Sequence, residues 1–238
     1  MKTFTALDGA LLVDKPAGPT SHDVVDNIRR QFGIAKVGHC GTLDPQATGL
    51  LILVLGQATK LSEKLMADDK VYCGHISFGV TTNSYDADGE VVSSLPVPPM
   101  TLEEINETAA TFVGDQMQEP PMVSAIKKDG VPLYKLARKG IEVERKPRLV
   151  HIYRFRFTEY QEPVGAFRIA CTKGTYVRSV AHDLGQKLGC GAHLTTLRRL
   201  VSGKFDVEDS MEYEELLNIS TAELEKRVIP MLQLAKDS

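Results

Sequence analysis

One short segment of this 238-residue chain, Gly38–Gly49, has the residue types most able to do chemistry. It reads GHCGTLDPQATG, and its single carboxylate, Asp44, stands before a proline among glycines and threonines. An apolar run at 50–55 follows and predicts a buried strand. The residues alone leave two interpretations open. Asp44 either forms an ordinary Asp-Pro turn, or it is a reactive carboxylate held at the edge of a core.

Two residues far from this segment could act together with a carboxylate. Arg178 ends the motif KGTYVR at 173–178. It is either a surface arginine or a guanidinium that pairs with a buried carboxylate and keeps it ionised. Tyr72 is either an ordinary strand aromatic or a platform on which a base stacks.

The sequence lacks the usual cofactor and metal motifs. Residues 33–38 have the glycine spacing of a phosphate loop, but the Lys-Ser/Thr pair that should follow is missing. Residues 189–194 begin like a dinucleotide fingerprint but lack its third glycine. The four cysteines form no Cys-x-x-Cys pair, and no His or Cys pairs recur at zinc-finger spacing. We therefore expect no cofactor, no metal, and reduced thiols in a cytosolic protein.

The distribution of charge is more informative than the net charge of −3, which alone argues against nucleic-acid binding. Residues 1–126 have a balance of −8, residues 127–204 of +11, and residues 205–238 of −6. A fold that keeps the basic middle together would offer a positive face to a polyanion. The alternative is an ordinary solvated run of charges.

The elements that must position these residues alternate irregularly, and several predicted strands are neighbours joined by turns. This favours an α+β fold with a mixed, mostly antiparallel sheet flanked by helices and loops. No apolar run approaches the roughly 20 residues that span a bilayer, so we expect no membrane contact. Apolar periodicity predicts strands at 10–13, 50–55, 71–79, 149–157 and 164–171. Periodicity and capping residues predict helices after Thr20 or Ser21, at 60–66, after Thr101, at 132–140, at 177–188 and after Ser220.

A series of motifs runs in order from Leu11 to about Val201. They are LVDKP at 12–16, VGHCGTLDP at 37–45, KVY at 70–72, YDADG at 85–89, SAIK at 124–127 with LY at 133–134, KGTYVR at 173–178, GCGAHL at 189–194 and LRRL at 197–200. So many motifs in this order, over most of the chain, are far more specific than one Asp-Pro loop. Taken together, they resemble the motifs of the TruB family of tRNA pseudouridine synthases.

The resemblance implies a pseudouridine synthase fold and an isomerase. It implies conversion of the T-loop uridine at position 55 of tRNA to pseudouridine, by base flipping and aspartate catalysis. No redox change or hydrolysis is involved, which agrees with the absence of a cofactor motif. The implied partner is the T-arm of tRNA. By default we expect a cytoplasmic monomer without an obligatory protein partner.

The resemblance also implies roles for the three candidate catalytic residues. Asp44 matches the essential aspartate, which attacks the nucleoside or abstracts a sugar proton. Tyr72 matches the aromatic residue that stacks on the flipped base. Arg178 matches the arginine that pairs with the aspartate and would lower its pKa.

Five further positions match substrate-binding residues of the family. His39 matches a residue that contacts the T-loop and helps to splay the target out. Tyr176 and Leu197 match residues that line the uracil pocket. Lys15 and Asp86 match supporting residues of the site.

The family carries an insertion that clasps the T-arm, and here it should cover about 116–148. Residues 127–148 hold eight Lys+Arg and three acids. From this segment we expect contacts to the RNA backbone by Lys127, Lys128, Lys135, Arg138 and Lys139.

The chain departs from the common bacterial pattern at its end, where a small C-terminal PUA domain usually follows. We therefore expect one catalytic domain over 1–238 and no PUA domain. Two alternatives remain: a non-catalytic tRNA-binding or tRNA-folding module on the same scaffold, or a synthase that acts on another RNA. The intact set of Asp44, Tyr72 and Arg178 weighs against a module that only binds.

Overall fold

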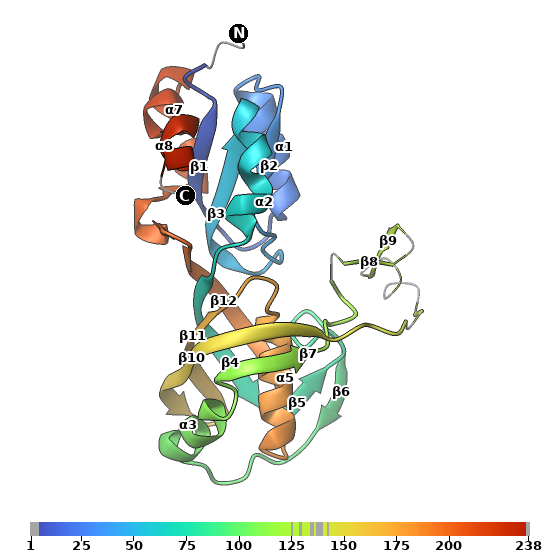
Figure 1. Ribbon diagram of the computed structural model, residues 1–238. Helices are drawn as coiled ribbons and strands as arrows, with labels where there is room; N and C mark the ends of the chain where they lie inside the picture. The colour runs from blue at the N-terminus through green and yellow to red at the C-terminus, as the bar shows by residue number, and fades with distance from the viewer. Residues whose placement is uncertain are drawn as a thin grey trace. The chain divides into compact units, whose positions relative to one another are not determined.

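The computed structural model describes residues 5–124, 126–128, 130–133, 136, 140–141 and 143–236 (Figure 1). The chain forms two compact units, one from residues 1–72 and 197–238 and the other from residues 73–196. It passes from one unit to the other within two strands, β4 (Lys70–Phe78) and β12 (Ala192–Ser202).

The first unit is built on two buried strands, β1 (Gly9–Lys15) and β3 (Thr48–Leu55), which pair antiparallel. Seven of the eight residues of β3 are buried, because both faces of the strand are covered. The short β2 (Val37–His39) pairs antiparallel with β3, and β12 pairs parallel with it. Smaller strands complete the sheet: β13 (Phe205–Asp206) on β12, and β14 (Met211–Glu212) and β15 (Ile229–Pro230) on β1.

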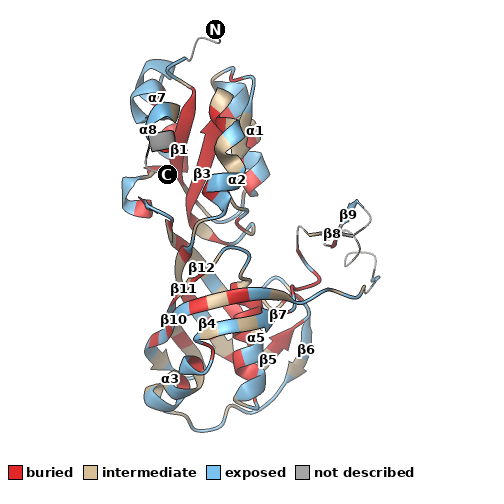
Figure 2. Ribbon diagram, in the orientation of Figure 1, coloured by how far each residue is buried: buried red, intermediate tan, exposed pale blue. Residues whose placement is uncertain are grey.

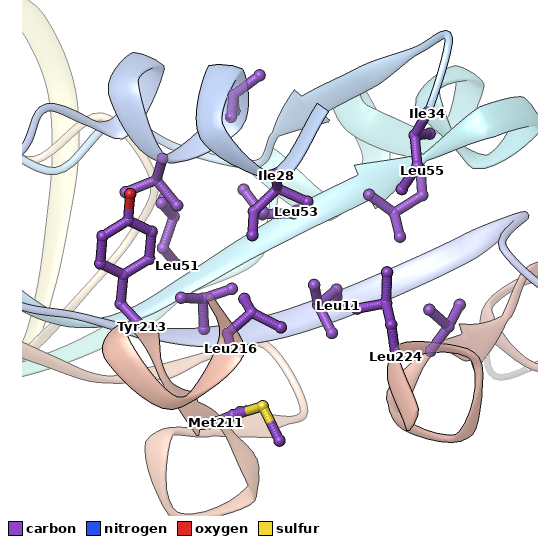
Figure 3. Packing of buried hydrophobic residues seen from close by; sticks show 14 of the residues in the cluster. Leu11, Ile28, Ile34, Leu51, Leu53, Leu55, Met211, Tyr213, Leu216 and Leu224 are labelled. Atoms are coloured by element: carbon purple, nitrogen blue, oxygen red, sulfur yellow. The ribbon is translucent and has the colours of Figure 1, made fainter. Parts of the chain in front are cut away.

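Alternate residues of β1 and β3 pack into two separate apolar clusters, since side chains alternate between the faces of a strand. One cluster, shown in Figure 3, joins β1 and β3 to helix α1 (Ser21–Gln31) through Ile28, and to α6 (Tyr213–Leu216) and α7 (Thr221–Arg227). We call it the α1-side core. The other cluster receives the 3₁₀ helices η1 (Gly56–Leu61) and η2 (Val207–Asp209), helix α2 (Ser62–Met66) and helix α8 (Met231–Lys236).

The second unit is a sheet in the order β12-β4-β11-β10-β7, where β7 is Gly114–Gln118, β10 is Arg148–Gln161 and β11 is Val164–Cys171. Its core is aromatic, with the rings of Phe155, Phe157 and Phe167 at centroid distances of 5.5 to 6.1 Å. This unit also contains helices α3 (Leu102–Ala110) and α5 (Val177–Lys187) and two strand pairs, β5 (Val80–Thr82) with β6 (Val91–Ser94) and β8 (Lys127–Lys128) with β9 (Val131–Pro132).

Most of the predicted elements are confirmed, as is the α+β class with a mixed, mostly antiparallel sheet. The capping boxes at Thr101 and Ser220 are present, and Thr20 caps α1. The predicted helix at 60–66 begins earlier, as a 3₁₀ turn at Gly56. The predicted start of the helix at Pro132 is wrong, because Pro132 is the last residue of strand β9. Leu133 and Leu136 are helical, as predicted. Residues 134, 135 and 137–139 lie outside the described residues.

Two findings bear on the kind of site this fold can carry. Among the described residues, no helix is both long and apolar enough to cross a membrane. The same part of the chain holds no group of three or more His, Cys, Asp or Glu side chains placed to bind a metal ion.

Candidate active site

Asp44 lies in the loop between β2 and β3, half-buried between two neighbours that anchor it. Leu43 and Ala47 are both buried in the α1-side core. The Leu43 N–H donates to Ser21 Oγ at 2.9 Å, and that hydroxyl donates to the Leu43 carbonyl at 3.1 Å. The Ala47 N–H donates to the Asp44 carbonyl at 3.0 Å and closes a turn. The backbone on both sides of the carboxylate is therefore fixed.

Lys15 ties the same loop to the end of β1. Its side chain is fully buried, and Nζ donates to the carbonyls of Pro16 and Pro19 at 2.8 Å and of Pro45 at 2.9 Å. Burial lowers the pKa of the Lys15 ammonium to about 8, although the negative charge of Asp44 acts in the opposite direction. The amine therefore stands close enough to the carboxylate to feel its charge.

Arg199 holds both ends of the Asp44 segment, a role that the sequence did not reveal. Its side chain is only 1% exposed. Nε donates to the Leu50 carbonyl at 2.7 Å, and the guanidinium also donates to the Gly41 carbonyl at 3.2 Å. The neighbouring Arg198 forms a bidentate pair with Asp14 at 2.6 and 2.9 Å. The only sequence signal was the Arg-Arg pair inside the otherwise apolar LRRLV at 197–201.

Tyr72 and Leu197 lie in the same unit as Asp44. Both are half-buried, and both pack against the α1-side core that also contains Leu43 and Ala47. An aromatic ring and an aliphatic side chain thus pack against the same core as Leu43 and Ala47, which flank the carboxylate. Side chains of these two types can stack on and cover a flat, partly apolar base.

His39 stands at the end of β2, opposite Leu53 of β3. Burial lowers the pKa of its imidazole, and the charge of Arg199 acts in the same direction. Within the described part of the chain, its buried Nδ1 has no hydrogen-bond partner. The residue lines a shallow cavity of about 410 Å³ whose wall includes the cations Arg29 and Lys36.

Arg178, in the second unit, is held by three groups of the protein. It lies in the first turn of α5 and is only 3% exposed. One guanidinium nitrogen donates to the Ser84 carbonyl at 3.0 Å and lies 3.5 Å from Asp86 Oδ2, and the other donates to the Val123 carbonyl at 2.8 Å. Asp86 in turn accepts from the Ser84 hydroxyl at 2.5 Å and from the Asp88 N–H at 3.1 Å. The guanidinium is therefore fixed rather than free to reorient.

Tyr176 directly precedes α5 and is held by a residue that the sequence did not nominate. The Gln118 amide accepts from the Tyr176 N–H at 2.7 Å and donates to the Tyr176 carbonyl at 3.1 Å. Gln118 is only 5% exposed. The Arg148 guanidinium lies 5.9 Å from the centre of the Tyr176 ring, which allows a cation–π contact.

The predicted site residues thus fall into two groups. The first unit holds Lys15, His39, Asp44, Tyr72 and Leu197, and the second holds Asp86, Tyr176 and Arg178. The pairing of Arg178 with Asp86 is observed, whereas its pairing with Asp44 stays a prediction. Of the predicted RNA-backbone contacts, Lys127 and Lys128 form β8, and Lys135, Arg138 and Lys139 lie outside the described residues.

Comparison with known proteins identifies the family. Residues 29–177 match the family model described as "TruB family pseudouridylate synthase (N terminal domain)". The chain belongs to the TruB family. Residues 178–234 match a second model, "tRNA pseudouridylate synthase B C-terminal domain".

Relatives at high identity support the same TruB assignment. The chain is 56% identical to the tRNA pseudouridine synthase B of Opitutus terrae, over 96% of this chain and 95% of that protein. It is 44% identical to the protein of the same name from Endomicrobium trichonymphae, over 97% of this chain and 99% of the relative. It is 50% identical to that of Syntrophotalea carbinolica, over 88% of this chain and 69% of the relative.

Solved structures share the fold of this chain. The chain matches the crystal structure of a Cbf5–Nop10–Gar1 complex with a TM-score of 0.75 at 28% identity, over 96% of this chain and 61% of that one. An H/ACA ribonucleoprotein bound to a substrate RNA containing 2′-deoxyuridine matches with a TM-score of 0.72 at 26% identity, again over 96% and 61%. The chain therefore spans less than two thirds of these structural relatives. The TruB resemblance and the pseudouridine synthase fold expected from the sequence are confirmed.

Proposed function

We propose that this TruB-family enzyme converts the uridine at position 55, in the T-loop of tRNA, to pseudouridine. The N-glycosidic bond of that uridine breaks, the uracil turns, and a bond forms between C5 and the sugar carbon, while a proton leaves C5 and one is gained at N1. No electrons are exchanged with another molecule and no water is consumed. The reaction accordingly requires no redox or nucleotide cofactor.

The observation that carries the proposal is the way Asp44 is held. Ser21, Lys15 and Arg199 fix the backbone of its loop through bonds to Leu43, Pro45, Gly41 and Leu50. An anchored carboxylate can meet the sugar or the base in a fixed geometry, which is how positioning lowers a barrier. The buried Lys15 ammonium is also close enough to Asp44 for the two charges to interact.

The target base must leave its stack before it can meet Asp44. Flipping costs a few kcal/mol. Stacking on Tyr72 would return roughly 1–3 kcal/mol, and Leu197 would cover the edge of the base. His39, beside a cavity that Arg29 and Lys36 make basic, supplies a contact for the neighbouring nucleotides.

We propose that residues of the second unit keep the catalytic carboxylate charged and help to form the uracil pocket. Arg178 would pair with Asp44 and keep it ionised, and Asp86 would hold the guanidinium in position. Tyr176 would line the uracil pocket, fixed through Gln118. The fixed guanidinium and the paired hydrogen bonds of Gln118 support these roles.

The decisive experiment replaces Asp44 by asparagine, which keeps size and polarity but removes the charge. We expect D44N to bind tRNA within about threefold of wild type and to form no measurable pseudouridine, because the chemical step loses the carboxylate proposed to act on the nucleoside. Tritium release from [5-³H]uridine-labelled tRNA measures the turnover. Asp209→Asn, at an exposed carboxylate of η2, is the matched control. Near wild-type turnover by D44N would remove Asp44 from the mechanism.

A second experiment separates the proposal from its alternatives. Pseudouridine would be mapped across all cellular RNA with and without this protein. Loss of the signal at position 55 of tRNA alone supports the proposal, and loss at sites in another RNA identifies a different substrate. Unchanged maps would favour a module that binds or folds tRNA without catalysis.

We also propose that the enzyme acts in the cytoplasm as a monomer and needs no protein partner. Light scattering after gel filtration, in the presence and absence of tRNA, measures the number of chains in the active species.

A further inference from the structure

The β10–β11 pair of the second unit carries three exposed arginines that the proposed mechanism does not use. Arg154 and Arg156 lie on β10 and Arg168 on β11, and all three are exposed. The residues between them, including Phe155, face the aromatic core and are buried. Figure 2 shows the resulting alternation of buried and exposed residues along β10. We call Arg154, Arg156 and Arg168 the arginine stripe.

Two members of the stripe face each other across neighbouring strands. Arg156 and Arg168 are register partners in the antiparallel pair, and Arg154 lies opposite Ala170. Like charges directly opposite each other weaken a sheet. Folding alone therefore gives no reason to place two guanidinium groups there.

The stripe is not neutralised by the protein. In the described part of the chain, no Asp or Glu oxygen lies within 4.0 Å of a guanidinium nitrogen of Arg154, Arg156 or Arg168. Two arginines near the candidate site differ in this respect, since Arg178 pairs with Asp86 and Arg198 with Asp14. The acids of this hairpin, Glu159 and Glu162, lie toward its turn.

An aromatic side chain extends the stripe along β10. The strand register shifts between Ile152 and Arg154, so that Tyr153 and Arg154 are exposed one after the other. The Tyr153 side chain is 50% exposed, and its ring lies 4.6 Å from that of His151. Exposed arginines next to an exposed aromatic ring are the composition of a surface that follows a nucleic-acid backbone.

We propose that the arginine stripe binds the sugar-phosphate backbone of the substrate RNA, outside the catalytic residues. This rests on the proposed function, which makes the substrate a polyanion. The guanidinium fork fits phosphate oxygens in a bidentate manner. Side chains on neighbouring strands, about 4.8 Å apart, can reach the same or adjacent phosphates. The phosphates then supply the negative charge that the protein does not provide.

The test removes the charges of the register partners Arg156 and Arg168 in the 238-residue chain. Arg156→Gln/Arg168→Gln is compared with Lys226→Gln/Arg227→Gln, which removes two exposed cations from α7 and matches the change in net charge. Affinity for tRNA is measured as a function of salt, with both the whole tRNA and an isolated T-arm hairpin. Turnover at saturating tRNA and circular dichroism of both variants are recorded alongside.

Loss of two phosphate contacts should weaken binding about tenfold at low salt. It should also reduce the slope of log K against log salt, in absolute value, by about 1.5. Turnover at saturation should equal that of wild type, since no catalytic residue changes.

Weakened binding of whole tRNA with unchanged binding of the hairpin would place the contact beyond the T-arm, and weakened binding of both would place it on the T-arm. Affinity and salt slope equal to those of the α7 control would overturn the proposal, whereas a wild-type protein without turnover would refute the proposed function instead.

Discussion

At the scale of single residues, the candidate site depends on cations that bind carbonyl groups. Lys15 and Arg199 are buried, and each donates to backbone carbonyls on the Asp44 loop. Such bonds offset the cost of burying a charge and at the same time hold the loop. The backbone of the loop that carries the half-buried Asp44 is thereby fixed on both sides of the carboxylate.

The depressed pKa of Lys15 leads to a prediction about charge coupling. We expect the ¹³Cε resonance of Lys15 to titrate near pH 8, well below the ordinary pKa of a lysine. Because the Asp44 charge raises this pKa, Asp44→Asn should move the midpoint lower still. NMR titration of ¹³C-lysine-labelled protein measures both values. An unchanged midpoint in D44N would show that the two groups do not interact.

The lowered pKa of Lys15 also determines how this residue changes the stability of the fold with pH. Between pH 8 and 10.5 the unfolded chain keeps the Lys15 proton while the folded chain has lost it. The unfolded state therefore binds more protons, and the contribution of Lys15 to the free energy of unfolding rises with pH across this window. Lys15→Met should remove that contribution, which urea unfolding at pH 8 and pH 10 can measure.

At the scale of elements, the parallel contact of β3 with β12 decides where the Asp44 loop ends. Gly49 pairs with Arg199 across these strands. Its φ is +96°, and a Cβ added there would lie 2.3 Å from the Arg199 carbonyl oxygen. A side chain at position 49 would thus push apart the two strands that anchor the catalytic loop.

We therefore expect Gly49→Ala to lower the free energy of unfolding by about 3 kcal/mol or more and to reduce turnover. Gly38→Ala is the matched control from the same motif. A Cβ at position 38 would meet only Val54 Cγ2 at an ordinary 3.5 Å, so the change should stay below about 1 kcal/mol. Urea unfolding of both variants measures the difference. Equal effects at the two positions would contradict the close approach at Gly49.

Local patterns predicted the elements that bury a regular face or carry a capping residue. The strand at 50–55 and the helices after Thr101 and at 177–188 were found in this way. β12 was not predicted, although it borders β3, because its central residues are Thr-Thr and Arg-Arg rather than alternating apolar and polar types. Arg199 is buried there by hydrogen bonds to remote carbonyls, which no local pattern records.

Residues of the candidate site were likewise predicted only where a motif of the sequence contained them. Asp44, Tyr72 and Leu197 were nominated through motifs, and the structure places Tyr72 and Leu197 against the core that anchors Asp44. Ser21 and Gln118 were missed, because their part is to bond the backbone of residues 22 and 58 positions away. Positioning residues of this kind become visible only once the fold brings those segments together.

At the scale of the whole molecule, function depends on where the charge lies rather than on its sum. The net charge of −3 would repel a polyanion at long range. The middle of the chain, with a balance of +11, contains the arginine stripe, Arg178 and the basic segment 127–148. We infer that the RNA is attracted by this part of the chain and not by the acidic remainder.

This view can be tested with two variants of equal charge. Lys135→Glu/Lys139→Glu reverses two charges in the basic segment, and Lys226→Glu/Arg227→Glu reverses two in the acidic C-terminal part. If net charge controlled binding, both would weaken tRNA affinity equally. We expect only the first to do so, with a plot of log K against log salt about 1.5 less steep, since two phosphate contacts are lost and two repulsions gained. Fluorescence anisotropy between 50 and 300 mM salt measures the slopes; an unchanged slope for the first variant would remove Lys135 and Lys139 from the RNA interface.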